Sequence, residues 1–189
     1  MSQLLVEARA GSEVALATFI RSSQPEIWRF CAHLVGSTHA DDATQETYLE
    51  AWRALPSFRG ESSARTWLFV IARRTALRLG RRQLRLSELD RQSPRPPQAP
   101  DPESWTELDC LINQLDEDRR LAIILTQVLG LSYADAAVVS GCAIGTIRSR
   151  VARAREDLLS VTAGTASRNR RPLTTDSSTL SVREASTES

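Results

Sequence analysis

A basic helix near the C-terminal end of the chain has the residue types and spacing that suit contacts with DNA bases. Residues 144–155 contain four arginines and no acid. On a helical wheel, one side carries Arg148, Ser149, Ala152 and Arg153, and the other carries Ile147, Val151 and Ala154. The apolar side can pack on a domain, while the opposite side offers guanidinium groups and small residues to a major groove. This division is typical of a recognition helix.

An arginine-rich face is in many proteins only solvated surface, but the residues upstream favour DNA contact. A helical run over 118–129 precedes a second helix over 133–139. Ser132 and Asp135 form a capping box at the start of that second helix, and Gly141 lies in the turn that follows it. A helix, a short turn and a second helix with a basic face together predict a helix-turn-helix.

A second basic helix is predicted over residues 63–85. Its apolar side carries Leu68, Ala72, Ala76 and Leu79, and its opposite side carries Arg73, Arg74, Arg78, Arg81, Arg82 and Arg85. Neighbouring like charges on a helix repel each other by some tenths of a kcal/mol per pair, roughly. A nucleic-acid backbone relieves that repulsion and gains salt-dependent affinity from it.

The loop before this helix combines polar residues with nearby aromatic rings. Phe58, Trp67 and Phe69 flank residues 59–65. Aromatic rings beside a basic surface can stack on exposed bases, although core packing explains Trp67 and Phe69, taken alone, slightly better. We therefore expect the loop 59–65 to be the part that holds an unpaired base.

A predicted helix over 41–55 has the opposite charge. Asp42, Gln45, Glu46 and Leu49 follow the spacing i, i+3, i+4, i+7 and form one stripe. Ala51, Trp52 and Leu55 are expected to face mostly inward. The acidic stripe is either solvated surface or a docking face for a basic partner helix.

The pattern along the chain predicts an all-α fold with two small helical domains, the second a helix-turn-helix domain. Two further helices are expected over 13–22 and 25–36. Five prolines between positions 94 and 102 indicate a linker, and a C-terminal stretch rich in Ser, Thr and Arg indicates disorder. The expected units are a first domain over 10–85, a linker over 86–102, a second domain over 103–161 and a disordered tail over 162–189.

Several function classes are excluded by what the sequence lacks. It has no set of nucleophile and base, no phosphate-binding loop and no metal-ligand spacing around its three cysteines. We therefore predict no enzymatic activity, no cofactor, no metal and no small-molecule substrate. It also has no signal peptide and no apolar run long enough to span a membrane, which predicts a cytoplasmic protein without membrane contact. The net charge of the chain is only +1. The separation of acidic and basic residues into different segments therefore matters more for binding than the net charge does.

Three segments in order resemble bacterial RNA polymerase sigma factors of the extracytoplasmic-function (ECF) type, and the overall pattern is most similar to actinobacterial members. Residues 41–49 (DDATQETYL) resemble the segment that binds core polymerase. Residues 58–68 (FRGESSARTWL) resemble the promoter-melting segment. Residues 130–150, with GLSYADAA and GTIRSR, resemble the second DNA-binding domain. The first domain would then be sigma region 2 and the second would be sigma region 4.

The resemblance implies a role for individual residues. Binding of the basic coiled-coil clamp of the polymerase is implied for Asp42, Gln45, Glu46 and Leu49. Contact with the −10 element, including capture of a flipped base, is implied for Arg59, Ser62, Ser63, Arg65, Trp67, Arg73, Arg74, Arg78 and Arg81. Contact with the −35 element is implied for Thr146, Arg148, Ser149, Ala152 and Arg153. Arg74 stands where many members carry Asn, and Ala152 where some carry a bulkier residue, so the preferred promoter sequence stays open.

The function implied is that of a detachable subunit that binds core RNA polymerase and promoter DNA and directs initiation. The family also allows an anti-sigma factor as a regulator, which this sequence does not identify. The main alternative is a stand-alone helix-turn-helix regulator, which would leave the acidic stripe and the six arginines of the first domain without a role. A second alternative is an adaptor whose basic helices bind acidic protein or RNA.

Overall fold

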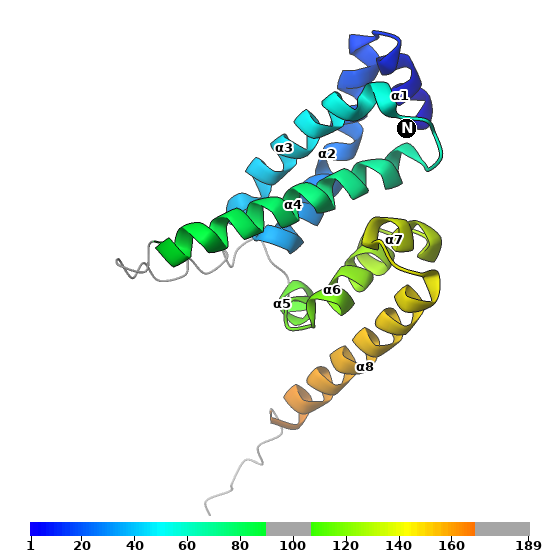
Figure 1. Ribbon diagram of the computed structural model, residues 1–189. Helices are drawn as coiled ribbons and strands as arrows, with labels where there is room; N and C mark the ends of the chain where they lie inside the picture. Colours follow the sequence, from blue (N-terminus) through cyan, green and yellow to red (C-terminus); the bar gives the residue numbers. More distant parts are fainter. Residues whose placement is uncertain (90–106, 169–189) are drawn as a thin grey trace, which may run out of the picture.

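The computed structural model describes residues 1–89 and 107–168, and every regular element in these ranges is a helix (Figure 1). The first range contains α1 (Ser2–Arg9), α2 (Glu13–Val35), α3 (Ala40–Ala54) and α4 (Ala64–Leu89), with short 3-10 turns at Ser37–His39 and Leu55–Ser57. The second range contains α5 (Glu107–Asn113), α6 (Glu117–Ile123), a π-helical turn (Ile124–Val128), α7 (Tyr133–Ser140) and α8 (Ile144–Arg168). The predicted all-α class is confirmed, while most of the predicted linker lies outside the described residues.

Helix α2 joins two helices that the sequence predicts to be separate. Pro25 lies inside it and removes only one backbone donor from the helical ladder. The buried side of the helix continues across this position through Phe19, Ile27 and Phe30. Packing of that side against α3 and α4 outweighs the lost hydrogen bond and keeps the helix continuous.

The first module has one core, built where α2, α3 and α4 meet. Phe30 and Phe69 pack edge to face, with ring centroids 5.1 Å apart and an interplanar angle of 86°. Leu68, Ala72 and Ala76 are buried beside them, which confirms the predicted apolar side of α4. Helix α1, which the sequence analysis did not anticipate, packs on α2 through Leu5 and Ala8.

The second module contains the predicted helix-turn-helix. The Ser132 hydroxyl accepts a hydrogen bond from the Asp135 N–H at 3.0 Å and caps α7. Gly141 ends α7 in the left-handed conformation, with φ 68° and ψ 36°, and turns the chain toward α8. Ile147 and Val151 are buried, so the predicted apolar side of α8 does face the module.

Two helices are longer than predicted. Helix α8 runs to Arg168, so residues 162–168 are helical rather than disordered. Helix α4 runs to Leu89, into the expected linker. Neither extension contains proline, and a helix that is already formed adds residues at little cost.

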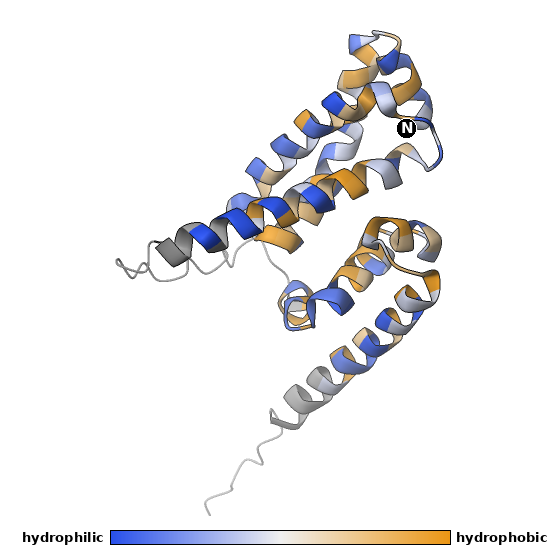
Figure 2. Ribbon diagram, viewed as in Figure 1, coloured by the Kyte–Doolittle hydropathy of each residue, from blue (hydrophilic) through white to orange (hydrophobic). Residues whose placement is uncertain are grey.

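The two modules contact each other through α4 and α7 (Figure 1). The Thr66 hydroxyl of α4 donates a hydrogen bond to Asp135 Oδ1 of α7 at 2.7 Å. The Arg65 guanidinium bridges Glu26, at 2.9 and 3.0 Å, to the backbone carbonyl of Leu129. Figure 2 shows hydrophobic residues gathered in the N-terminal half of α4.

A buried histidine also lies between the modules. His33 of α2 has a side chain that is 3% exposed, and its Nε2 lies 3.7 Å from Asp109 Oδ1 of α5. Burial lowers the pKa of His33; Asp109 raises this pKa, whereas Arg120 and Arg29 lower it. Because the lowering effects dominate, the packed arrangement favours the neutral imidazole.

We predict that the chain loses stability as the pH falls through the ordinary histidine range near 6.5. Unfolded His33 binds protons more readily than folded His33, so the free energy of unfolding decreases as pH falls. Urea unfolding between about pH 5.5 and 7.5 measures this change. His33→Gln should flatten the pH dependence, and His39→Gln is the matched control; an equal slope in both variants would contradict the assignment.

Candidate nucleic-acid and partner interfaces

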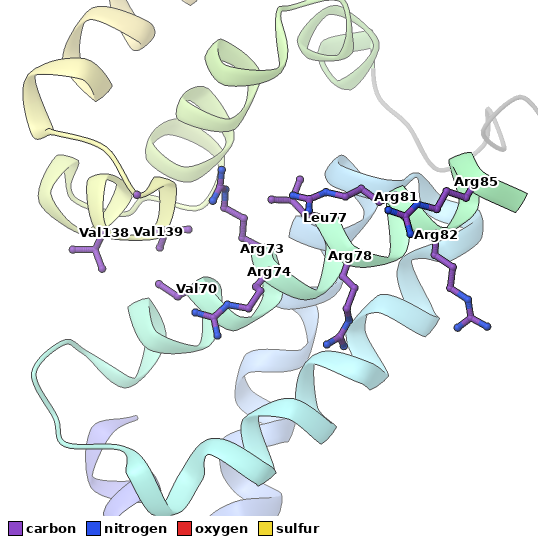
Figure 3. A pocket seen from close by; sticks show the side chains of 11 residues that line it. Val70, Arg73, Arg74, Leu77, Arg78, Arg81, Arg82, Arg85, Val138 and Val139 are labelled. Atoms are coloured by element: carbon purple, nitrogen blue, oxygen red, sulfur yellow. The ribbon is translucent and has the colours of Figure 1, made fainter. Parts of the chain in front are cut away.

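The arginine side of α4 lines a groove of about 750 Å³ between α4 and α7 (Figure 3). Its lining includes Arg73, Arg74, Arg78, Arg81, Arg82 and Arg85 from α4, and Val138, Val139 and Gly141 from α7. In Figure 3, Arg73 points toward the second module, whereas Arg78 points toward α3. The groove therefore has one strongly basic wall and one apolar wall.

Arg78 is the arginine of this set that pairs with carboxylates of the described residues. Its Nη2 lies 3.0 Å from Glu46 Oε1 and 3.3 Å from Glu50 Oε1, both on α3. From sequence, Arg78 and Glu46 belong to two separate surfaces, and the structure brings them together. The Arg78 side chain is 53% exposed, so each pair contributes at most about 1 kcal/mol and can exchange for other partners.

The loop between α3 and α4 encloses a small hollow of about 160 Å³. Its lining comprises Ser57, Phe58, Arg59, Gly60, Glu61, Ser62 and Trp67. The rings of Phe58 and Trp67 pack with centroids 5.1 Å apart, and the Phe58 carbonyl accepts a hydrogen bond from Arg9 Nη1 at 2.8 Å. Arg59 is exposed at the rim, whereas Phe69 is fully buried in the core. Of the two rings after the loop, Trp67 thus reaches the hollow and Phe69 does not.

Two other predicted loop residues are engaged within the protein. Arg65 bonds to Glu26 and Leu129, and its guanidinium carbon lies 5.5 Å from the centroid of the Phe69 ring. The Ser63 hydroxyl accepts a hydrogen bond from the Thr66 N–H at 3.0 Å and caps α4. These contacts hold the start of α4 in place, and nothing in the sequence pattern distinguishes them from free polar residues.

The second basic surface lies on α8. Arg148, Ser149, Ala152 and Arg153 are exposed together, and Thr146 is half-buried beside them. The side chains of Arg148 and Arg153 form no hydrogen bond or ion pair with another residue of the described ranges. The remaining two arginines are held: Arg150 pairs with Asp118, and Arg155 donates to Gln127 Oε1 at 2.8 Å. Arg148 and Arg153 are therefore available to a ligand, whereas Arg150 and Arg155 bind residues of the second module.

The acidic stripe lies along α3 as predicted. Asp42, Gln45 and Leu49 are exposed, and Glu46 is half-buried against Arg78. The prediction for Trp52 is wrong, because its side chain is 55% exposed while Ala51 and Leu55 are buried. Trp52 follows Leu49 by three positions, so it continues the exposed stripe by one helical turn.

The described residues contain no group of three or more His, Cys, Asp or Glu side chains that could hold a metal ion. Burial raises the pKa of the Cys31 thiol to about 11, partly offset by the hydroxyls of Thr44 and Thr47. This thiol is therefore protonated at neutral pH and a poor nucleophile. No helix in the described part of the chain is both long and apolar enough to cross a bilayer.

Comparison with known proteins identifies two matched segments. The family model for Sigma-70 region 2 matches residues 19–86, and the model for Sigma-70 region 4 matches residues 105–158. The ECF RNA polymerase sigma factor SigC of Mycobacterium tuberculosis is 45% identical over 171 residues, covering 84% of this chain and 89% of that protein. The ECF RNA polymerase sigma-E factor of Escherichia coli is 34% identical over 181 residues, covering 82% and 90%.

Two solved structures share the fold. The sigma factor RpoE in complex with the anti-sigma factor NepR from Bartonella quintana has a TM-score of 0.67 and 31% identity, covering 78% of this chain and 96% of that one. CnrH in complex with the cytosolic domain of CnrY has a TM-score of 0.68 and 26% identity, covering 86% and 97%.

The Arg78 pairing yields a prediction about binding of polyanions. Glu46→Gln combined with Glu50→Gln should raise the affinity for single-stranded DNA, because Arg78 is released and two negative charges leave the basic side of α4. The slope of log K against log salt should steepen by roughly one phosphate contact. Fluorescence anisotropy measures both quantities. The same charge change at Glu7 and Glu13 is the control, and an equal gain there would contradict a local effect.

Proposed function

This chain belongs to the sigma-70 family as a sigma factor of the ECF type, and we propose that α3 binds core RNA polymerase while α4 and α8 bind two promoter elements. The observation that supports this division best is the presence of one acidic stripe and two basic faces on three separate helices. Sigma factors direct initiation and are not enzymes. The alternative, a stand-alone helix-turn-helix regulator, explains only the second module. It does not explain why residues 19–86 match Sigma-70 region 2.

Docking on polymerase is proposed for Asp42, Gln45, Glu46 and Leu49. Exposed carboxylates of one sign steer a basic coiled-coil clamp toward α3 and favour one orientation of it. Engagement of Glu46 by that clamp would also remove one of the two carboxylate partners of Arg78, which pairs with Glu46 and Glu50 in the free protein. Docking on polymerase and binding of DNA are thereby linked through the two exchangeable ion pairs of Arg78.

Contact with the −10 element is proposed for Arg59, Ser62, Ser63, Arg65, Trp67, Arg73, Arg74, Arg78 and Arg81. The free arginines of α4 suit phosphates, which position DNA without reading its sequence. The 160 Å³ hollow beside Trp67 suits a single unstacked base. Flipping a base costs a few kcal/mol, roughly, and contacts in such a hollow offset that cost.

Contact with the −35 element is proposed for Thr146, Arg148, Ser149, Ala152 and Arg153. Their exposure on the first turns of α8 suits entry of that helix into a major groove. Arg148 and Arg153 carry the bidentate geometry that reads guanine. We further propose a region 2 domain over 10–85, a linker over 86–102 and a region 4 domain over 103–161, acting in the cytoplasm where polymerase works.

Regulation by an anti-sigma factor is consistent with the groove between α4 and α7. One wall carries arginines and the other carries Val138 and Val139. An acidic amphipathic helix would satisfy both walls at once, by pairing with the arginines and covering Val138, which is exposed. Such a partner would compete with DNA for α4. The RpoE and NepR complex is a case of a sigma factor held by an anti-sigma factor.

Transcription in vitro with purified core polymerase tests the proposed function. The chain should start transcripts from a subset of a genomic promoter library, and core alone should not. Asp42→Arg combined with Glu46→Arg should abolish core binding, because like charges then face the clamp. Glu7→Arg combined with Glu13→Arg is the matched control. Unchanged core affinity of the first variant would remove the docking assignment, and failure on every promoter would remove the proposed function.

Arginine substitutions on α8 separate base reading from phosphate contact. Arg148→Ala and Arg153→Ala should each weaken promoter binding by about 1–3 kcal/mol and relax choice at one −35 position. Arg150→Ala, which loses the pair with Asp118, should lower stability without changing that choice. Binding to a set of single-base promoter variants measures the effect. A uniform loss across all variants would show that the arginine contacts phosphate.

A further inference from the structure

An apolar pocket of about 510 Å³ opens beside the acidic stripe, between α2 and α3. Its lining includes Leu16, Ile20, Trp28, Tyr48, Leu49 and Trp52. Asp41 and Gln45 also line it, so the pocket is continuous with the stripe proposed to dock on polymerase. The docking role proposed for the acidic stripe depends on its charged side chains and assigns no function to this pocket.

Two of the apolar residues that line the pocket are exposed to solvent. The Trp52 side chain is 55% exposed and Leu49 is 45% exposed. Covering apolar surface gains roughly 25 cal/mol per Å², and Trp is among the residues that most often dominate an interface. Exposed carboxylates nearby contribute less affinity, because water and salt screen them.

The pocket walls are held in place by hydrogen bonds, so the pocket does not depend on a partner for its shape. The hydroxyls of Tyr48 and Ser23 lie 2.7 Å apart and share a hydrogen bond. Trp28 Nε1 donates to Asp41 Oδ1 at 2.8 Å. Both aromatic residues thus have satisfied polar ends and present apolar ring surface to the hollow. The bond to Trp28 also fixes a carboxylate at the rim.

We propose that this pocket receives one large apolar side chain from a basic helix of the polymerase, with Trp52 and Leu49 supplying most of the affinity. The proposal rests on the docking function assigned to α3. Charge complementarity selects the occupant: Asp41 lines the pocket, and Asp42 and Glu46 lie on the same helix α3, so a fitting helix carries Arg or Lys one turn from its apolar anchor. The carboxylates then steer the encounter, and the pocket sets the lifetime of the complex.

Binding kinetics on immobilised core polymerase at low and high salt test this division. Trp52→Ala should weaken binding by about tenfold or more, mainly through faster dissociation and with little dependence on salt. Asp42→Asn combined with Glu46→Gln should mainly slow association, and high salt should erase that effect. Val14→Ala, at a 78% exposed position on α2, is the matched control and should bind like the wild type.

A second variant tests the pocket without touching its exposed rim. Ile20→Phe fills part of the hollow and should also speed dissociation, with circular dichroism and thermal unfolding confirming that the chain folds. If Trp52→Ala and Ile20→Phe both bind like the wild type while the charge variant is slowed, the anchor proposal is wrong and docking on α3 stands. If no variant changes core binding, docking on α3 is wrong as well. A change of oligomeric state in Trp52→Ala alone would assign the pocket to a second copy of the chain and overturn the proposal.

Discussion

Burial of the apolar side of α4 is the constraint on which both functional surfaces of the first module depend. Phe69 packs against Phe30, and Leu68 and Ala72 are buried beside it, so these contacts fix the rotational setting of the helix. At that setting the arginines of α4 must face outward. Residues 64–85 of the helix contain no acidic side chain that could offset their mutual repulsion. The core thus holds in place a charge arrangement that an isolated helix would avoid.

Within the described residues, opposite charges meet in several ion pairs that are partly exposed. Arg78 reaches Glu46 and Glu50 across α3 and α4, while Arg150 reaches Asp118 within the second module. The net charge of +1 hides this arrangement. Exposed pairs of this kind are weak and exchange readily for a partner that carries many charges.

Local patterns in the sequence predict most of the helices, the capped turn and the two basic faces, because each depends on neighbours within a few residues. What the sequence misses depends on tertiary contacts. Pro25 predicts the start of a helix, yet α2 continues through this position because residues before and after it are packed in the core. Trp52 reads as core, yet the core is already filled by Ala51 and Leu55. The sequence pattern does not distinguish Arg148 from Arg150. The fold shows that Arg150 forms an ion pair with Asp118.

The π-helical turn at Ile124–Val128 sets the angular phase between the two halves of the second module. Its backbone bond from the Leu129 N–H to the Ile124 carbonyl, 2.9 Å long, spans five residues instead of four. One additional residue in a helix rotates everything after it by about 100°. In this orientation the Leu129 carbonyl accepts a hydrogen bond from Arg65 of the first module. A relative one residue shorter here would keep its helices and its charges but would aim α8 in a different direction.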